Sequence, residues 1–206
     1  MEFEVREQPF LRAPVERDTA RVTTPFAFIG IPYGVPYAEV DLSVCAGAAD
    51  AVRAASWDAG WAFNWQNMNF DTGRAIFASG EPNVTDCGNV VGELSAPNEI
   101  WNIGMDRIRP LAENGVVPLV VGGLDSIPPI VVGAFEGTGK KYNILHVDAH
   151  LDFREERYGV TRGFSSPIRR IREFGCVNDV VQVGLRSMGS ARVGDVEGPE
   201  RRATGS

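Results

Sequence analysis

The stretch N-I-L-H-V-D-A-H-L-D-F, residues 143–153, decides the expected fold and site of this 206-residue chain. Its apolar start predicts a β-strand, and four polar residues then occupy every second position: His146, Asp148, His150 and Asp152. Alternate side chains of a strand point to the same face, so two imidazoles and two carboxylates are expected to gather at the end of this strand. Burying such a group is costly unless a positive charge compensates it, and a divalent metal ion is the usual solution.

Two other interpretations of this stretch stay open. His146 and His150 are four residues apart, which also suits an H-x-x-x-H pair on a helix, although the apolar, β-branched lead-in favours a strand. The acidic groups could instead be neutralised by Arg154, Arg157 or Lys141 without a metal ion. If a metal binds, the absence of cysteine from the set favours Mn²⁺, Zn²⁺, Fe²⁺ or Ni²⁺ over a structural thiolate zinc site.

The composition excludes several classes of protein. A net charge of -7 argues against a nucleic-acid partner, and no apolar run approaches the roughly 18 residues of a membrane span. The N-terminus lacks the order of a secretory signal, and Cys45, Cys87 and Cys176 are odd in number, so we expect free thiols in a reducing cytoplasm. Both histidines lie in residues 143–153, which leaves none to activate a serine or cysteine nucleophile.

Apolar runs alternate with helical patterns along the chain. Strands are expected at residues 26–32, 83–91, 116–121, 143–147 and 180–185, and helices at residues 46–56, 98–114 and 127–135. This order predicts an α/β protein with three layers, α/β/α, around a mainly parallel sheet. We expect an N-terminal arm at residues 1–24, the α/β domain at 25–186 and a loose tail at 187–206, because the tail has no aromatic residue, leucine or isoleucine.

Two further features carry functional hypotheses. Trp57, Trp61 and Trp65 are spaced by four residues, which predicts one helix face that packs in the core or a subunit interface, or else forms the wall of a ligand pocket. Asp125 follows the strand at 116–121 in the loop G-G-L-D-S, at the end of a parallel sheet where ligands collect. Asp125 is therefore either a helix N-cap or a further metal ligand.

Several of these motifs, in this order, resemble a known family. H-V-D-A-H-L-D-F is similar to the central metal motif of the ureohydrolases, the arginase and agmatinase family, and agmatinases in particular. The supporting segments are residues 28–32, which resemble the first strand, 47–53 (compare G-P-x-x-I-R), 86–90 (compare D-x-G-D-V) and 118–126 (compare P-L-x-L-G-G-D-H-S).

The resemblance implies an arginase-like fold and a homo-oligomer. It also implies hydrolysis of a small cationic guanidino substrate, such as agmatine, to urea and an amine at a centre of two Mn²⁺ ions. Asp148, His150 and Asp152 match the positions of metal ligands in the family motif. Asp125 stands where the family has a histidine ligand, and we expect it to substitute as a ligand, since a carboxylate also binds Mn²⁺.

Two departures from the family pattern limit this expectation. Arg162 stands where the agmatinase-like pattern has histidine, so a proton-transferring imidazole is replaced by a cation that could bind a substrate carboxylate or pair with the acidic group. The motif S-x-D-x-D-x-x-D-P, which supplies two more aspartate ligands, does not occur in these 206 residues. The alternatives are therefore a fragment, or a degenerate member that acts as an oligomer or interaction partner without catalysis. A third is another metal hydrolase on the same fold, such as a deacetylase-like enzyme.

Overall fold

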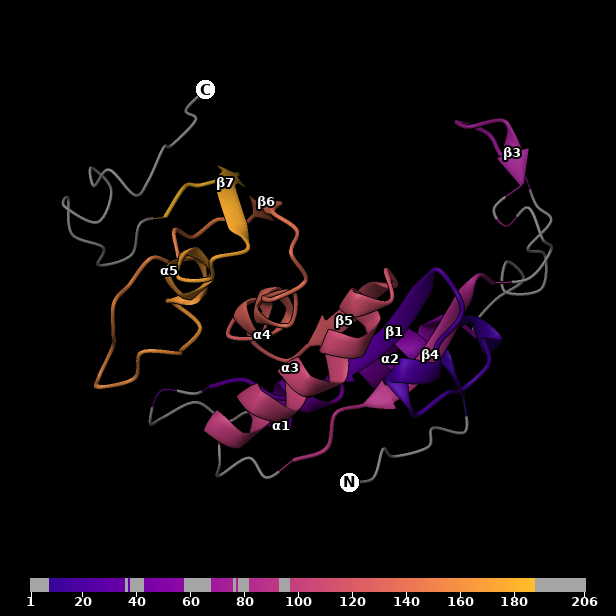
Figure 1. The fold of residues 1–206 in the computed structure, drawn as a ribbon, viewed down its shortest axis with the longest axis horizontal. Helices are drawn as coiled ribbons and strands as arrows, with labels where there is room; N and C mark the ends of the chain where they lie inside the picture. The colour runs from indigo at the N-terminus through magenta and orange to yellow at the C-terminus, as the bar shows by residue number, and fades with distance from the viewer. Residues whose placement is uncertain are drawn as a thin grey trace.

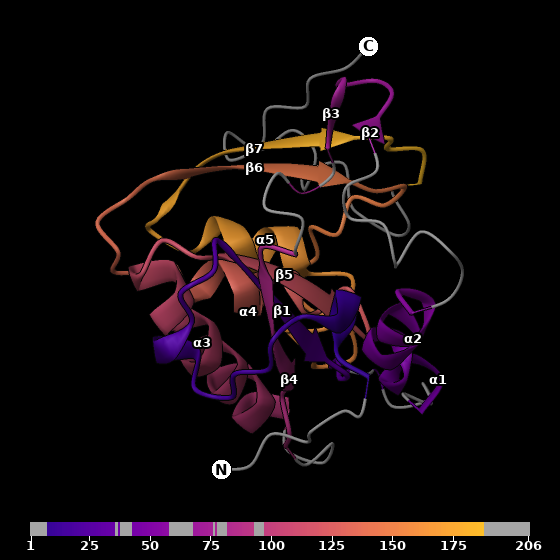
Figure 2. The same ribbon diagram turned by 90° about the vertical axis from the view of Figure 1, so that its right-hand side faces the viewer.

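The computed structural model describes residues 8–35, 37, 43–57, 68–75, 77, 82–92 and 97–187 (Figures 1 and 2). Its strands are β1 (Phe26–Ile31), β2 (Met68–Asn69), β3 (Arg74–Ala75), β4 (Val84–Asn89), β5 (Val117–Gly122), β6 (Tyr142–Val147) and β7 (Val177–Val183). Its α-helices are α1 (Ser43–Ala46), α2 (Ala48–Ala55), α3 (Pro97–Glu113), α4 (Pro128–Gly133) and α5 (Pro167–Arg172), and two short 3-10 turns, Phe10–Arg12 and Thr19–Arg21, precede β1.

Three strands form a parallel sheet in the order β4-β1-β5. Ala27, Ile29 and Ile31 of β1 point to one face, where they pack against apolar residues of α3 and α4. Phe28 points to the other face, towards α2 and the N-terminal residues. Both faces of β1 are buried, which explains why its sequence is a continuous apolar run. The predicted α/β class with a parallel sheet is confirmed, and this sheet lies between two layers.

A second parallel pair, β6-β7, lies apart from the first sheet, with α5 beneath it (Figure 2). Ile144 and Val180 pack against Ile168 and Ile171 of α5. The alternate side chains of β6, Leu145 and Val147, point to the face opposite α5, and the described residues leave that face uncovered. Leu145 is 68% exposed there and Val147 is 73% exposed. Neighbouring exposed apolar side chains of this kind commonly mark an interaction surface.

The N-terminal residues pack on the sheet of the same chain. Phe10 stacks on Phe28 with ring centroids 4.3 Å apart, and the Phe10 N–H donates to Asp86 Oδ2 at 2.7 Å. Val15 forms a β-bridge with Asp86 on the outer side of β4. Residues 8–24 of the predicted arm therefore protect the free edge of β4.

A buried arginine connects α2 to β4. The Arg53 side chain is fully buried, and its Nε and Nη2 donate to the two carboxylate oxygens of Asp86 at 2.8 and 2.9 Å. Its Nη1 donates to Asn89 Oδ1 at 2.6 Å. Arg53 belongs to the segment that resembles G-P-x-x-I-R, and Asp86 belongs to the segment that resembles D-x-G-D-V. The two segments are therefore joined by one buried ion pair.

Some predictions fall outside the described residues. Trp61, Trp65 and residues 188–206 of the expected tail are among them, so the tryptophan face is not tested. Trp57 is described, and its Nε1 donates to the carbonyl of Pro9 at 2.7 Å. None of the helices in the described ranges is both long and apolar enough to cross a membrane.

Candidate metal centre

The central motif begins in β6 and continues in the loop that follows it. The strand ends at Val147, so alternation along the strand carries only His146 and the adjoining Asp148 to one side. Asp152 reaches the same place by a turn in which its own backbone has a φ of 49°, a left-handed conformation in which aspartate is one of the more common residues. The loop is held in position by Leu151 and Phe153, which are buried against α5.

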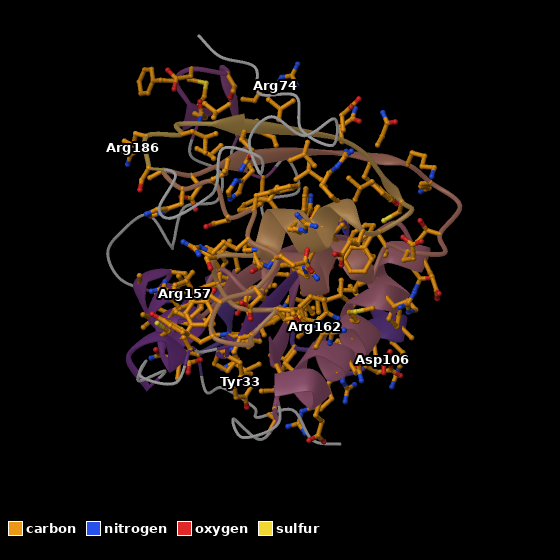
Figure 3. All side chains as sticks on the ribbon, turned by 90° about the vertical axis from the view of Figure 1, so that its left-hand side faces the viewer. Tyr33, Arg74, Asp106, Arg157, Arg162 and Arg186 are labelled. Atoms are coloured by element: carbon orange, nitrogen blue, oxygen red, sulfur yellow. The ribbon has the colours of Figure 1, made fainter. Side chains whose placement is uncertain are left out.

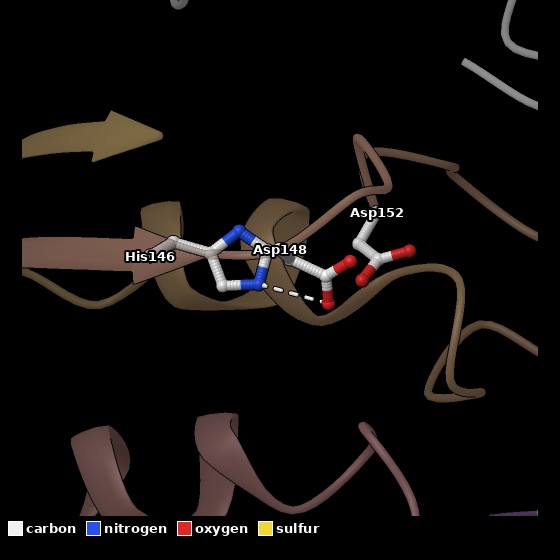
Figure 4. A group of neighbouring side chains, drawn as sticks. All are labelled: His146, Asp148 and Asp152. Carbon is white, nitrogen blue, oxygen red and sulfur yellow. Dashed lines mark ion pairs between the residues drawn. The ribbon is translucent and has the colours of Figure 1, made fainter. Parts of the chain in front are cut away.

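Three side chains of this motif form a compact group, which we call the acid–histidine cluster: His146, Asp148 and Asp152 (Figure 4). One nitrogen or oxygen atom of each lies within 4.8 Å of the others. Nε2 of His146 is 3.6 Å from Oδ2 of Asp148. The three groups are thus close enough for a single cation to lie beside the two carboxylates.

The other two predicted ligands lie near this cluster. The His150 side chain is 60% exposed, its Nδ1 is 3.2 Å from Asp148 Oδ1, and its backbone N–H donates to the same oxygen at 2.7 Å. Asp125 lies in the loop after β5, where burial, and secondly the negative charge of Asp148, raise the pKa of its carboxyl group. Asp148 and Asp152 are thus in the cluster, while His150 and Asp125 interact with it. Metal ligation by all four stays a prediction.

The charges of the cluster are compatible with a bound cation. Burial, followed by the charges of Asp148 and Asp125, raises the pKa of Asp152 to about 7. Oδ2 of Asp152 is buried and has no hydrogen-bond partner among the described residues. The pKa of Asp148 is lowered although burial opposes this, because the His150 N–H and the nearby imidazoles favour its charged form. An unpaired buried carboxylate oxygen beside a second carboxylate is a suitable ligand for a divalent ion such as Mn²⁺.

Gln182 of β7 determines how His146 can act. Its Nε2 is 3.0 Å from the Leu151 carbonyl oxygen and 3.0 Å from Nδ1 of His146. Because a carbonyl oxygen only accepts, this atom is the amide NH₂, whose second hydrogen is available to His146 Nδ1. A neutral imidazole that accepts at Nδ1 carries its hydrogen on Nε2, the atom that faces Asp148. A nitrogen that carries hydrogen does not bind a metal ion, so this network favours His146 as the group that orients Asp148.

A groove of about 490 Å³ adjoins the cluster. Its walls are the edges of β5 and β6, and its floor is formed by side chains of α4 and α5. Asp125 and His146 are among the residues that line it. His146 of the cluster is therefore accessible from the space between the two sheets.

Arg162, the residue that departs from the family pattern, contacts an aromatic ring. Its guanidinium carbon is 4.4 Å from the ring centroid of Trp101, a buried residue of α3. Figure 3 labels Arg162 among the side chains of this face. The two sequence hypotheses for Arg162, a substrate carboxylate or the acidic group as partner, are not tested by this contact.

Two residues of the site were not assigned a role from the sequence. His146 belongs to the alternating pattern but was not among the predicted ligands, which follow the family motif. The sequence contains one indication of a role for Gln182, which is its polar side chain among the valines of V-N-D-V-V-Q-V. Its partner could not be identified, because pairing of Gln182 with His146 depends on the register of β7 against β6.

Comparison with known proteins gives a consistent family. Residues 24–201 match the sequence pattern of the family described as "Arginase family". The mitochondrial arginase 1 of Oryza sativa subsp. indica is 29% identical over 192 residues, which are 89% of this chain and 54% of that enzyme. The guanidinobutyrase of Pseudomonas aeruginosa is 27% identical over 183 residues, 88% of this chain and 53% of that enzyme.

A solved structure shows the same arrangement of the chain. The arginase from Medicago truncatula superposes with a TM-score of 0.62 at 26% identity, covering 81% of this chain and 51% of that one. The chain thus spans about half the length of the curated relatives that it matches. The family match extends over most of the sequence, including β1, the Arg53–Asp86 pair and the acid–histidine cluster, and the chain belongs to the arginase family.

Proposed function

We propose that this chain carries the metal-binding part of an amidinohydrolase that converts a small cationic guanidino compound, of the agmatine type, to urea and an amine. The observation that carries the proposal is the acid–histidine cluster, with its unpaired buried Asp152 oxygen, in a chain of the arginase family. We further propose that the protein is a homo-oligomer and that it is cytoplasmic. The free thiols at Cys45, Cys87 and Cys176 agree with the proposed cytoplasmic location.

The proposed ligands are Asp125, Asp148, His150 and Asp152, with Mn²⁺ as the metal. A bound divalent ion supplies a strong nucleophile at neutral pH by lowering the pKa of water. The carboxylates balance the charge of the ion, and His146, held by Gln182, orients Asp148. The negative charge of the loops also favours approach of a cationic guanidinium group over that of an anionic substrate.

Metal binding and urea release test the two parts of this proposal separately. Titration calorimetry of the purified chain with Mn²⁺ should show binding that Asp152→Asn weakens by about 10-fold or more. Urea should be released from agmatine, guanidinobutyrate or arginine by the Mn²⁺-loaded chain or by a longer form of the same protein. A longer form that binds Mn²⁺ and releases urea from none of the three would overturn the assigned reaction.

A second candidate function is a family member without catalysis that serves as an oligomer partner. One observation favours it: Asp125 replaces a histidine of the family pattern. In that case the chain should not bind Mn²⁺ tightly, and Asp148→Asn should leave its assembly with other subunits unchanged.

A further inference from the structure

The residues that follow the acid–histidine cluster form an irregular loop, residues 153–166, which connects Asp152 to α5. The two ends of this loop are joined by backbone hydrogen bonds. The Arg154 N–H donates to the Ser165 carbonyl at 3.1 Å, and the Ile168 N–H donates to the Asp152 carbonyl at 3.1 Å. The place of Asp152 therefore depends on how the end of the loop near Ser165 is held.

We propose that Tyr37, which follows β1 in the chain, is a positioning residue that fixes the 153–166 loop and thereby Asp152. The proposal rests on the proposed function, in which Asp152 is a metal ligand. Tyr37 lies outside the helices and strands, yet its side chain is only 5% exposed. Its hydroxyl group and its ring both contact the loop.

The Tyr37 hydroxyl group binds one residue of the loop twice. It shares a hydrogen bond with Ser165 Oγ, and it accepts a second from the Ser165 N–H at 3.2 Å. A buried tyrosine hydroxyl normally has such a partner, since leaving it without one costs free energy. Ser165 in turn holds Arg154 through its carbonyl, so an unbroken series of hydrogen bonds leads from Tyr37 to the residue two positions after Asp152.

The Tyr37 ring contacts three further residues of the loop. Its centroid is 4.5 Å from that of Phe164, and the guanidinium carbon of Arg157 lies 5.0 Å from the same ring. A Cβ at Gly163 would clash with the ring, so glycine is the residue that allows this close contact. One side chain thus packs against both the middle and the end of the loop.

The 153–166 loop needs such a contact because it has little regular structure of its own. Its middle is a tight turn in which Arg157 and Val160 exchange backbone hydrogen bonds of 3.0 and 2.9 Å. Tyr158 in this turn is 77% exposed and has a φ of 52°, which is uncommon for a bulky residue. A site on a loop is held precisely only when neighbouring residues fix that loop, and Tyr37 supplies this contact.

The segment that carries Tyr37 is itself anchored to another loop of the site. The Val35 N–H donates to Ser126 Oγ at 2.7 Å, and Ser126 is fully buried. Ser126 directly follows Asp125 in the loop after β5. The segment after β1 therefore contacts both loops that carry proposed carboxylate ligands, and Tyr37 is its contact with the loop of Asp152.

Tyr37→Phe is the test, because it removes the hydroxyl group and keeps the ring. In the purified 206-residue chain, we expect the amide hydrogens of Arg154 and Ile168 to exchange about 5-fold faster, the effect of losing one hydrogen bond. Calorimetry should show that Mn²⁺ binding is weakened by a similar factor of about 5. Ser165→Ala added to Tyr37→Phe should cause little further change, because both variants remove the same side-chain hydrogen bond.

Tyr33→Phe is the matched control. Tyr33 also follows β1, and its hydroxyl group is likewise bonded to a distant backbone, accepting from the Gly92 N–H at 2.9 Å and donating to the Gly92 carbonyl at 2.7 Å. Removal of this hydroxyl group should speed exchange at Gly92. It should leave the exchange of Arg154 and Ile168, and the affinity for Mn²⁺, unchanged.

The outcomes distinguish a positioning role from general packing. Faster exchange of Arg154 and Ile168 together with weaker Mn²⁺ binding, in Tyr37→Phe but not in Tyr33→Phe, supports the proposal. Unchanged exchange overturns it, as does faster exchange with unchanged Mn²⁺ affinity. Faster exchange that extends equally to residues 26–31 also overturns it, because Tyr37 would then support the whole core. If the unmodified chain binds no Mn²⁺, the proposed function fails at its metal, while the exchange rates still decide whether Tyr37 fixes the loop.

Discussion

At the scale of single residues, the two histidines of the central motif have different tasks in the proposed site. Gln182 donates to Nδ1 of His146, so the neutral imidazole carries its own hydrogen on Nε2, whereas His150 is exposed and contacts Asp148. We therefore expect His150→Ala to weaken Mn²⁺ binding more than His146→Ala, by calorimetry on both variants. Gln182→Leu should resemble His146→Ala, with about a 10-fold loss, because both changes remove the orientation of Asp148.

The opposite order of affinities would refute this assignment. If His146→Ala abolishes Mn²⁺ binding and His150→Ala does not, the acid–histidine cluster itself is the ligand set. In that case Gln182 must donate elsewhere when the metal is bound.

The buried pair of Arg53 and Asp86 leads to a prediction on stability. Arg53→Met leaves the Asp86 carboxylate buried without its cation, which should lower the free energy of unfolding by about 3–5 kcal/mol. Urea denaturation measures the change. Arg21→Met is the control, because the Arg21 side chain is 73% exposed and its ion pair with Glu16 is 3.8 Å long, so a loss below about 1 kcal/mol is expected.

A double variant tests whether the unpaired charge of Asp86 causes the destabilisation expected for Arg53→Met. Asp86→Asn removes the remaining buried charge, so Arg53→Met combined with Asp86→Asn should be more stable than Arg53→Met alone. If the second change adds a further loss, the destabilisation comes from lost packing and not from the unpaired charge.

At this scale the sequence predicted which residues carry charge in the site but not what each one does. Asp148 and Asp152 are adjacent in space, as the motif indicates. Asp152, however, arrives through a left-handed turn and not through strand alternation. The task of His146 depends on a hydrogen bond from another strand, 36 positions away, which no local pattern reports.

At the scale of elements, the contact of Glu136 with the residue before β7 predicts a pH-dependent stability. The Cys176 N–H donates to Glu136 Oε2 at 2.9 Å, and this bond lowers the pKa of the carboxyl group. Because the folded-state pKa is below the unfolded value, the stabilisation is present above that value and is lost as the pH falls. Glu136→Gln should lower the free energy of unfolding at pH 7, by well under ~1 kcal/mol because solvent screens this group, and should lower it by less at pH 3.

Denaturation curves at both pH values measure this effect. Exposed Glu113 of α3 supplies the control, and Glu113→Gln should not lower the stability at pH 7. A loss for Glu136→Gln that is equal at pH 7 and pH 3 would show that the charge of Glu136 is not involved.

The elements that the sequence predicted best are those with a continuous apolar run or a long helical period. The strands expected at 26–32, 116–121 and 143–147 are observed within one residue at each end, and the helix at 98–114 is observed at Pro97–Glu113. The helix α5 was not predicted, since its six residues P-I-R-R-I-R carry too few apolar positions to show a period. Its two isoleucines become core residues only because β6 and β7 pack above them.

At the scale of the whole molecule, the two sheets should differ in local stability. Both faces of β1 are buried, whereas one face of β6 and β7 is partly buried and the other is exposed. We therefore expect amide hydrogens of residues 26–31 to exchange more slowly than those of residues 142–147 and 177–183 in the isolated chain. Hydrogen exchange followed by mass spectrometry tests this, and equal protection would indicate that both sheets open as one unit.

The separation of the strands into two sheets could not be predicted from the sequence. Each strand could be recognised from its own residues, and a mainly parallel sheet followed from the alternation with helices. Which strands are neighbours depends on long-range pairing, however, and the chain does not encode locally that β5 and β6 are separated by a groove. The predicted parallel arrangement of strands is thus confirmed, but the strands lie in two separate sheets, β4-β1-β5 and β6-β7.

The order of elements along the chain has a consequence for synthesis on the ribosome. All strands of the β4-β1-β5 sheet, together with the buried residues of its main core, lie before residue 135. This unit can therefore complete its core as the chain emerges, before β6 is translated. The β6-β7 pair then docks through α5 onto a unit that is already folded.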